Sequence, residues 1–553
     1  MKLNGAEITI KLLEQFGIKT IAGIPGGANL PLYHALNKSS IQHILARHEQ
    51  GAGFIAQGMA RSTGETAVCL ATSGPGVTNL ITAIADAKLD SVPMVAITGQ
   101  IAYSMVGSDA FQEIDTYGIT LGITKHNFLV RSAAELLSII PEAFYIAESG
   151  RPGPVLIDIP KDVQKEIIEI NHWPKKRPLQ REESISSDMI EQAVNMLREA
   201  KKPVLYVGGG IISSQGTDIL ITLAHKNNIP VATTLMGLGS YPSDDELFMG
   251  ILGMHGAKYT NYAFYESDLI LAIGVRFDDR AIGNANEFCK NAKIIHVDID
   301  PSEINKVKQA SLCIEGDAKD ALEQITLMIE ENDRKEWLNR VKTLKTENPL
   351  YAGIENIPEH PVNILKTIYD IADKDAIICT DVGQHQMWVA QCYPIHKPRT
   401  LLTSSGLGTM GFGLPAAIGA ALENPDKTII CFTGDGSILM NIQELATMAD
   451  FKLNIKVIIL NNGHLGLVRQ LQEMFYDKKY IATKFMTNPD FPMIAKGFGI
   501  NSYDLSFEED YVSKLKELLT NEGGCLINIP TDSNELVLPI VSPGSGNHVM
   551  IGA

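Results

Sequence analysis

Two apolar runs near the end of this chain constrain its fold more than any other feature. The first, residues 429–433, leads into Gly-Asp-Gly-Ser at 434–437, and the second, residues 456–460, ends in the pair Asn461-Asn462. Between the runs, residues 440–450 place apolar side chains on one side of a helix. The pattern predicts strand, helix and strand, which is one β-α-β unit with two parallel and neighbouring strands.

Asp435 and Asn462 leave these two strands at the same edge of the predicted sheet. One cation can therefore touch both side chains, and the backbone carbonyl of His464 adds a third hard oxygen of the kind that Mg²⁺ prefers. Gly436 and Ser437 open the helix, where free N–H groups and the positive end of the dipole favour phosphate. The sequence thus predicts a magnesium and diphosphate site, although Gly-Asp-Gly by itself more often marks a tight turn.

The spacing from Gly434-Asp435-Gly436 to the Asn pair resembles the thiamine diphosphate (ThDP) signature of the pyruvate-decarboxylase-like enzymes. A second segment, residues 68–88, repeats the plan of strand, Gly-x-Gly and helix. Pro75 stands there in the place of Asp435, so this copy lacks the carboxylate that would hold a cation. We interpret the two segments as related halves with a single metal site between them.

Helix and strand signals alternate along the chain, which is typical of α/β domains. Its 553 residues exceed what one core normally holds and suggest three domains, at 1–170, 185–340 and 360–553. Linkers are expected at about 173–183 and 343–361. We therefore expect three doubly wound α/β domains with mostly parallel sheets.

Composition excludes several classes of function. A net charge of −17 without a Lys/Arg cluster argues against a nucleic-acid or anionic-membrane partner. No apolar run approaches the roughly 20 residues that span a bilayer, and residues 1–20 resemble neither a secretory signal nor a transit peptide, so we expect a cytoplasmic protein. Seven scattered cysteines form no Cys-x-x-Cys pair, which favours buried reduced thiols over disulfides or zinc ligands.

Two other groups of residues allow two interpretations each. Glu49 precedes a predicted helix, where it is either a functional carboxyl or a first-turn acid favoured by the dipole. In the middle region, glycines follow the predicted strands 203–207 and 269–273, and Asp298 follows the strand 293–297. Such loops suit a nucleotide. However, the Gly-x-Gly-x-x-Gly motif is missing, and Asp298 lies much farther along the chain than the acidic residue of that motif. A doubly wound domain without a nucleotide is therefore the alternative interpretation.

The chain as a whole resembles the catalytic (large) subunits of acetohydroxyacid synthase, also called biosynthetic acetolactate synthase. The resemblance rests on the following segments: Arg47-His-Glu-Gln-Gly-Ala, Ser73-Gly-Pro-Gly, Asp109-Ala-Phe-Gln-Glu, Leu252-Gly-Met254-His255-Gly, Arg276-Phe-Asp-Asp279-Arg280 and Gly408-Thr-Met-Gly. The family implies pyrimidine-binding, FAD-binding and diphosphate-binding domains in this order, with ThDP, Mg²⁺ and FAD as cofactors. Its reaction decarboxylates pyruvate on ThDP and transfers the two-carbon unit to pyruvate or 2-ketobutyrate, the first common step of branched-chain amino-acid biosynthesis.

By this resemblance, Glu49 would contact the pyrimidine ring, Met410 would hold the cofactor bent, and Gly408 would accept a hydrogen bond from its amine. The resemblance implies a catalytic set of Glu49, Gln100, Phe111, Lys161 and Arg280, and a metal set of Asp435, Asn462 and His464. The ThDP set is Gly26, Glu49, Val382, Gly383, Gln384, His385, Gly408, Met410, Asp435, Gly436, Ser437, Asn462 and Leu467. Arg280 would grip the acceptor carboxylate, although its spacing alone favours a surface ion pair with Asp278 or Asp279.

For FAD, which takes no net part in the family's reaction, the resemblance implies a further set: Arg151, Gly208, Gly209, Gly210, Thr234, Leu235, Met254, His255, Gly274, Arg276, Asp278, Asp298, Ile299, Asp317 and Ala318. A cofactor shared between subunits implies a homodimer or homotetramer, and a small regulatory subunit is a further expected partner. The rival identities are a catabolic acetolactate synthase that lacks FAD, and pyruvate oxidase. The segment at 276–280 and the glycine run argue against the first.

One position departs from the family. Many members have Trp in the helix after the Asn pair, where this chain has Leu471. A Leu removes an aromatic wall from the acceptor pocket, and one methylene contributes only about 1 to 3 kcal/mol of discrimination. We expect a weak preference for 2-ketobutyrate over pyruvate.

Overall fold

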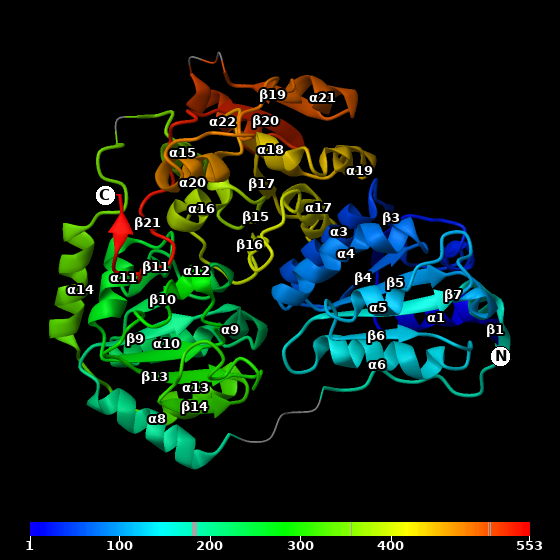
Figure 1. Cartoon of the computed structure of the whole chain (residues 1–553), viewed down its shortest axis with the longest axis horizontal. Helices are drawn as coiled ribbons and strands as arrows, with labels where there is room; N and C mark the ends of the chain where they lie inside the picture. Colours follow the sequence, from blue (N-terminus) through cyan, green and yellow to red (C-terminus); the bar gives the residue numbers. More distant parts are fainter. Residues whose placement is uncertain (180–184, 356, 507, 509, 553) are drawn as a thin grey trace.

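Three six-stranded parallel sheets, each covered by helices, form three lobes of the structure (Figure 1). The computed structural model describes residues 1–179, 185–355, 357–506, 508 and 510–552. The N-terminal lobe is blue to cyan, the middle lobe is green, and the C-terminal lobe is yellow to red. The expected fold class of three doubly wound α/β domains is confirmed. The expected linker at 173–183 lies partly outside the described residues.

The N-terminal sheet has the strand order β3-β2-β4-β5-β7-β6, and every pair is parallel. Its strands are β2 (Thr20–Gly23), β3 (Gln42–Leu45), β4 (Ala67–Ala71), β5 (Met94–Gln100), β6 (His126–Leu129) and β7 (Pro154–Pro160). Its helices are α1 (Gly5–Gln15), α2 (Leu30–Leu36), α3 (Glu49–Thr63), α4 (Pro75–Leu89), α5 (Thr116–Thr120), α6 (Leu136–Glu148) and α7 (Lys161–Lys165). A small antiparallel pair, β1 (Lys2–Asn4) and β8 (Ile167–Glu169), closes the lobe.

The middle sheet has the order β11-β10-β9-β12-β13-β14 and is also parallel throughout. Counted along the chain, this is the order 3-2-1-4-5-6 of dinucleotide-binding domains. Its strands are β9 (Pro203–Val207), β10 (Val231–Thr233), β11 (Phe248–Ile251), β12 (Leu269–Ile273), β13 (Lys293–Asp298) and β14 (Leu312–Glu315). Its helices are α8 (Ser187–Glu199), α9 (Gly209–Ser213), α10 (Thr217–Asn227), α11 (Lys258–Glu266), α12 (Asp279–Ile282), α13 (Ala318–Met328) and α14 (Lys335–Glu347).

The C-terminal sheet repeats the N-terminal topology, with the order β16-β15-β17-β18-β20-β19. Its strands are β15 (Ile377–Thr380), β16 (Leu401–Leu402), β17 (Ile429–Gly434), β18 (Ile455–Asn461), β19 (Asn501–Asp504) and β20 (Cys525–Pro530). Its helices are α15 (Pro361–Ile371), α16 (Gln384–Cys392), α17 (Gly413–Glu423), α18 (Asp435–Ile438), α19 (Leu445–Asp450), α20 (Gly466–Phe475), α21 (Phe491–Gly497) and α22 (Tyr511–Thr520). The predicted parallel pair that precedes Asp435 and Asn462 is confirmed as β17 and β18.

Two predicted boundaries differ from the structure. The predicted helix at 440–450 is reduced to α19, because the Asn441 side chain donates to the carbonyl of Gly411 at 2.8 Å and the chain leaves helical geometry there. The linker expected from residue 343 begins only after α14, since Trp337, Val341 and Leu344 continue one buried helical face. Polar composition alone had suggested a loop there.

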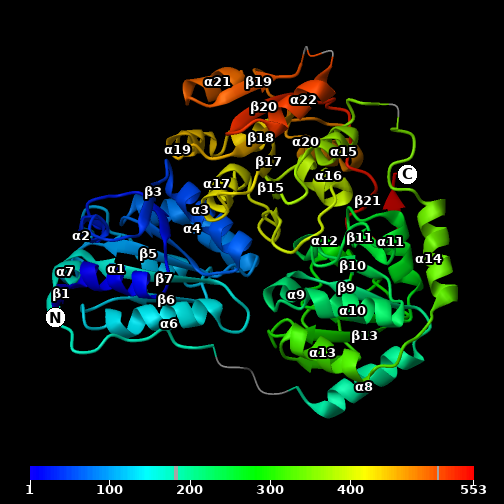
Figure 2. The same cartoon turned by 180° about the vertical axis from the view of Figure 1, so that it is seen from behind.

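The last described residues return to the middle lobe instead of ending on their own sheet. The red strand β21 (Ile540–Val541) lies among green elements in both views (Figures 1 and 2). The Val541 N–H donates to the carbonyl of Met254 at 2.9 Å, and Asn547 donates to the carbonyl of Ala281 at 2.7 Å. β21 also pairs with β22 (Met550–Ile551). The proposed third domain, 360–553, therefore includes residues 541–551 by their position in the chain, although these residues pack against the middle lobe.

The N-terminal and C-terminal lobes share one continuous apolar core through α3 and α17. These helices lie against each other in both views (Figures 1 and 2). A Cβ atom on Gly58 would meet the backbone of Ala416, and one on Gly419 would meet the backbone of Ile55 and Met59. The two helices therefore approach to backbone contact, which only glycine permits at these positions.

All seven cysteines lie in described residues; they are free, and five of them are buried, as predicted. None of the described helices has both the length and the apolar character required to cross a membrane.

The close approach of α3 and α17 makes Gly419→Ala destabilising. Alanine normally favours a helix interior over glycine, but here the methyl group would overlap the backbone of α3. We expect a loss of about 1 to 3 kcal/mol in the free energy of unfolding, the range found for overpacked cores, measured as a lowered Tm. Gly497→Ala, at a helix position with nothing within 4 Å of the added Cβ, serves as the matched control. Equal Tm values for the two variants would contradict the packing argument.

Candidate active site

The loops after β15 and β17 lie at the point where the strand order of the C-terminal sheet reverses. β15 pairs with β16 on one side and with β17 on the other, so the loops after β15 and β17 lead away from each other at adjacent strand ends. Ligands of open parallel sheets bind at such points. Residues 381–384 follow β15 there, and Asp435 follows β17.

Asp435 is buried with a relative exposure of 1%. Its Oδ2 has no hydrogen-bond partner among the described residues, although the backbone N–H groups of Asn462 and Gly463 approach the carboxylate. Burial raises the pKa of Asp435 to about 6. Buried polar atoms without partners are rare, so this oxygen suits a cation.

The backbone N–H of Asn462 approaches the Asp435 carboxylate, and His464 contacts Asn462. The Asn462 Oδ1 accepts from the His464 N–H at 2.9 Å and keeps a second lone pair, while its Nδ2 donates to Gln384 at 3.1 Å. Among the described residues, no group of three or more His, Cys, Asp or Glu side chains gathers to hold a metal. A donor set of carboxylate, amide oxygen and carbonyl fits Mg²⁺ better than zinc.

The residues expected around a diphosphate line the same loops. A Cβ atom on Gly383 would lie 2.8 Å from the His385 ring, and Gly383 has φ of +155°. Burial lowers the pKa of His385 to about 3, so the ring is neutral. The Ser437 Oγ accepts from the Gly434 N–H at 3.3 Å, next to Gly436, whose added Cβ would touch Leu465. Val382 donates through its N–H to Asp381 at 2.8 Å.

Glu49 is the first residue of α3 and is 9% exposed. Its Oε2 accepts from Asn79 on α4 at 3.0 Å, and its Oε1 would lie 3.6 Å from a Cβ atom on Gly76. Gly26, at the end of the neighbouring β2 loop, packs against Thr72, which also touches the Gly76 position. Glu49 and Gly26 therefore face the Gly-x-Gly loop of the N-terminal lobe, the counterpart of the Asp435 loop.

Met410 and Gly408 lie on the loop that leads into α17. Gly408 has φ of +65°, a conformation that favours glycine. Directly after Met410, the Gly411 N–H donates to Asp381 at 2.8 Å, and the same carboxylate holds Val382. Asp381 thus fixes two of the expected cofactor segments to each other. Leu467 is half-buried near the start of α20.

Several of the predicted FAD residues lie at the switch point of the middle sheet. Gly208, Gly209 and Gly210 follow β9, and Gly274 follows the adjacent β12. A Cβ on Gly210 would lie 2.6 Å from the Gly274 Cα, so the two loops touch through their backbones. Asp298 ends β13, and burial raises its pKa to about 6. Ile299 follows it. A strand order of 3-2-1-4-5-6 with glycines at this edge fits a dinucleotide.

Several other predicted FAD residues already have local partners. Asp278 caps α12, Asp317 caps α13, and Thr234 caps the short turn at 235–237 that begins with Leu235. Arg151 donates to Glu303 at 2.7 Å and to Asp300 at 3.2 Å, joining the N-terminal lobe to the middle lobe. Ala318 is the first residue of α13, and Arg276 lies near Gly406. The His255 Nδ1 is buried without a partner among the described residues, and burial lowers the pKa of His255 to about 4.

Comparison with known proteins decides the family. Residues 3–119, 190–325 and 381–529 match the N-terminal TPP-binding, central and C-terminal TPP-binding domains of thiamine pyrophosphate enzymes. The chain is 51% identical over 552 residues to the acetolactate synthase isozyme 1 large subunit of Escherichia coli (strain K12), covering 100% of this chain and 98% of that protein. The chain belongs to the family of acetolactate synthase large subunits.

Other relatives extend the likeness beyond one isozyme. Identity is 44% over 549 residues to the acetolactate synthase isozyme 2 large subunit of the same bacterium, covering 99% of each chain. It is 45% over 563 residues to the chloroplastic acetolactate synthase of Arabidopsis thaliana, covering 98% of this chain and 83% of that one. As a member of this family, the chain is a ThDP-dependent acetolactate synthase.

The structure does not bring all the predicted catalytic residues of this acetolactate synthase together within one chain. The Gln100 amide is buried and donates to Asp158 at 2.9 Å and to the carbonyl of Ile114 at 3.1 Å. Lys161 begins α7, and Phe111 is 88% exposed on the loop after β5. These three stay in the N-terminal lobe, and their roles stay predictions.

Arg280 lies in the middle lobe beside Met254, with its Nη1 3.5 Å from the Met254 Sδ. Its Nε is 3.7 Å from Asp279 Oδ2, and the two side chains are 72% and 82% exposed. The surface ion pair that spacing suggested is therefore present, and it is weak because both charges are in water. Most of the guanidinium remains accessible.

Sequence reasoning missed Asp381, Asn79 and Asp158. Asn79 follows Gly76 by three residues and so faces the same side of α4, a signal that spacing offered. Asp158 lies inside a strand, where burial raises its pKa to about 6 and Thr98 and Gln100 donate to it. The contact between Asp381 and Gly411 spans 30 residues and has no local signature.

Removal of the buried charge at Asp435 tests the magnesium site. Asp435→Asn should weaken Mg²⁺-dependent ThDP binding by at least about tenfold, since even supporting residues of metal sites contribute 10- to 100-fold. Calorimetric titration with ThDP at fixed Mg²⁺ measures this. Asp477→Asn, an exposed acid in the same lobe, is the control. Unchanged affinity in Asp435→Asn would exclude this carboxylate as the metal ligand.

Proposed function

We propose that this acetolactate synthase decarboxylates pyruvate and transfers the two-carbon unit to pyruvate or 2-ketobutyrate. ThDP and Mg²⁺ are the proposed cofactors at the C-terminal sheet edge. The observation that carries the proposal is the buried Oδ2 of Asp435, which has no partner in the part of the chain that the structure describes and lies close to Asn462. This donor set matches the cation that accompanies a diphosphate.

Each residue has a proposed task. Asp435, Asn462 and the His464 carbonyl would hold Mg²⁺, and Glu49 would hold a proton on the pyrimidine ring. ThDP supplies an acidic carbon and a cationic ring that accepts the electrons released by decarboxylation. At 9% exposure, Glu49 is largely screened from water, and its carboxyl could share a proton with a ring nitrogen. Met410, whose neighbour Gly411 is bonded to Asp381, would keep the cofactor bent.

Arg280 is the proposed anchor for the acceptor carboxylate. Its guanidinium is mostly exposed, and its partner Asp279 lies 3.7 Å away in water, so a substrate carboxylate can displace that contact at low cost. Arg is suited to this task because its planar donors match both carboxylate oxygens.

FAD is proposed for the crevice at Gly208 to Gly210 and Gly274, with Asp298 at the end of β13 near the ribose. The glycine contact and the strand order support the proposal. A flavin spectrum from the purified protein would separate it from an FAD-independent acetolactate synthase. Measurement of acetolactate against peroxide or quinone reduction separates it from pyruvate oxidase.

We also propose a small partner subunit, because bacterial relatives carry the name large subunit. A homodimer or homotetramer is proposed because the cofactor would be shared between subunits.

The role of Glu49 predicts a large loss of rate in Glu49→Gln. Glutamine keeps the size of the side chain but cannot share a proton with the ring. General acid–base groups contribute about 10²- to 10⁴-fold, and we expect kcat to fall within this range at saturating ThDP. Glu65→Gln, an exposed acid in the same lobe, should keep the wild-type rate. Full turnover by Glu49→Gln would remove Glu49 from the mechanism.

Leu471 predicts how the acceptor is chosen. With both 2-keto acids present, the wild type should form only a modest excess of 2-aceto-2-hydroxybutyrate over 2-acetolactate, because Leu471 leaves the pocket wide. Leu471→Trp should increase that ratio by about 10- to 100-fold, within the ~1 to 3 kcal/mol that one methylene provides. Product analysis in competition assays measures the ratio. A strong preference already present in the wild type would show that other residues set the specificity.

A further inference from the structure

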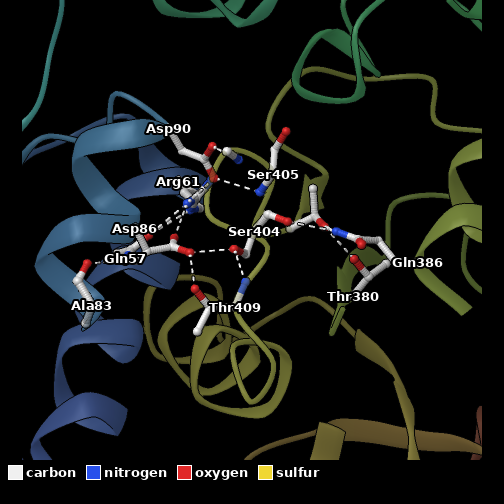
Figure 3. Close-up of polar contacts among 12 residues, drawn as sticks. Gln57, Arg61, Ala83, Asp86, Asp90, Thr380, Gln386, Ser404, Ser405 and Thr409 are labelled. Atoms are coloured by element: carbon white, nitrogen blue, oxygen red, sulfur yellow. Dashed lines mark hydrogen bonds and ion pairs between the residues drawn. The ribbon is translucent and has the colours of Figure 1, made fainter. Parts of the chain in front are cut away.

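A buried cluster of charges joins the N-terminal lobe to the loop that carries Gly408 and Met410 (Figure 3). Arg61 on α3 lies between the carboxylates of Asp86 on α4 and of Asp90, the C-cap of α4, with its Nη2 3.1 Å from Asp86 Oδ1 and 2.9 Å from Asp90 Oδ2. The side chain of Arg61 is 6% exposed, and those of both aspartates are 0% exposed. Gln57 accepts a further bond from Arg61 at 2.8 Å.

Both carboxylates also reach across to the C-terminal lobe, as Figure 3 shows. Asp86 accepts from the hydroxyl groups of Ser404 and of Thr409, the latter at 2.9 Å. Asp90 accepts from the backbone N–H groups of Ser405 at 3.0 Å and Gly406 at 2.7 Å. The Ser404 hydroxyl also accepts from the Thr409 N–H at 2.8 Å, so the loop is closed on itself. Residues 404–409 are therefore tied to α4 on both sides of Gly408.

The same contacts bracket Met410. Thr409, which precedes it, is bound to Asp86, and Gly411, which follows it, donates to Asp381 at 2.8 Å. Met410 thus has a carboxylate from each lobe holding its two neighbours. A side chain carried between two fixed residues keeps its position within a narrow range.

The charges of Arg61, Asp86 and Asp90 are not needed to hold the two lobes together. The apolar core through α3 and α17 already joins the two lobes, and buried ion pairs are often no more stabilising than apolar side chains of the same size. Burial raises the pKa of Asp86, while the charge of Arg61 and the hydroxyl groups of Ser404 and Thr409 lower it. The carboxylates provide acceptors at fixed points for the N–H and O–H donors of the loop, which apolar side chains could not do.

We propose that Arg61, Asp86 and Asp90 are positioning residues, which set the loop at 404–411 so that Gly408 and Met410 hold the cofactor in its reactive shape. The inference rests on the proposed function. It assigns to the N-terminal lobe a second task besides supplying Glu49, since it shapes the loop of the C-terminal lobe in the same chain.

The test removes the two hydroxyl donors and leaves the charges in place. The double variant S404A/T409V deletes both side-chain bonds to Asp86, and T409S is the conservative rescue that keeps one hydroxyl at that site. The matched control is D450N, which removes an exposed pair across the same two lobes, Arg47 Nη2 to Asp450 Oδ2 at 2.5 Å. For each protein, the rate at which the acidic carbon of bound ThDP exchanges its proton for deuterium is measured by NMR, together with the Kd for ThDP and the Tm.

S404A/T409V should slow the exchange by about 10- to 100-fold, the size expected when a reacting group is misplaced by about 1 Å. T409S and D450N should exchange at close to the wild-type rate. Exchange at the wild-type rate in a folded, ThDP-saturated S404A/T409V would overturn the inference. If the double variant does not fold, T409V alone carries the same expectation and the same refutation. A wild type that fails to accelerate exchange would instead refute the proposed function, so the two failures are distinguishable.

Discussion

The backbone contact between α3 and α17 is the constraint on which both terminal lobes depend. The two helices form a shared layer between the N-terminal and C-terminal sheets, and glycines on each helix allow the other to approach. Glu49 begins α3, and the loop with Gly408 and Met410 leads directly into α17. A slip of one helical turn would move these groups by about 5.4 Å relative to each other. The register of this pair therefore fixes the position of Glu49 relative to the loop at 408–410, two groups with proposed roles that belong to different lobes.

The terminal sheets share one strand order, yet their loops have diverged in chemistry. β17 leads into Asp435, and its counterpart β4 leads into Ser73-Gly74-Pro75, where no carboxylate is available for a cation. The N-terminal loop instead faces Glu49 and Asn79. Under the proposed function, each half would therefore supply one kind of group: the cation ligands of the Asp435 loop in one half, and the Glu49 carboxyl in the other. A bipartite coenzyme needs both.

The sequence was most informative where chemistry follows a strand directly. Asp435, Asn462 and His464 were placed together from the ends of two parallel strands, and the glycines of the middle lobe from the ends of β9 and β12. It was least informative for contacts between distant segments. The bond from Asp86 to Ser404 spans 318 residues, and Asp381 to Gly411 spans 30. No local pattern encodes such pairs. The strand order of the middle sheet could not be predicted either, because hydrophobic periodicity does not show which strands pair.

Local reasoning failed in two instructive places. Thr343 to Glu347 are polar enough for a loop, but Leu344 continues a face begun by Trp337, and packing decided for helix. Gln100 and Arg280 show a different problem. Gln100 is bonded to Asp158, and Arg280 forms a weak exposed pair with Asp279, so contacts within one chain neither require nor exclude a role with substrate.

The return of residues 541–551 to the middle lobe has a consequence for how the protein is made. The carbonyls of Met254 and of Ala281 on α12 are bonded to residues that follow the whole C-terminal sheet in the chain. The middle lobe therefore cannot complete its contacts in simple vectorial order as it leaves the ribosome, although domains generally fold one after another from the N-terminus. These contacts of the middle lobe form only after residues 541–551 have been synthesised, so the lobe passes through an interval in which the carbonyls of Met254 and Ala281 lack these partners.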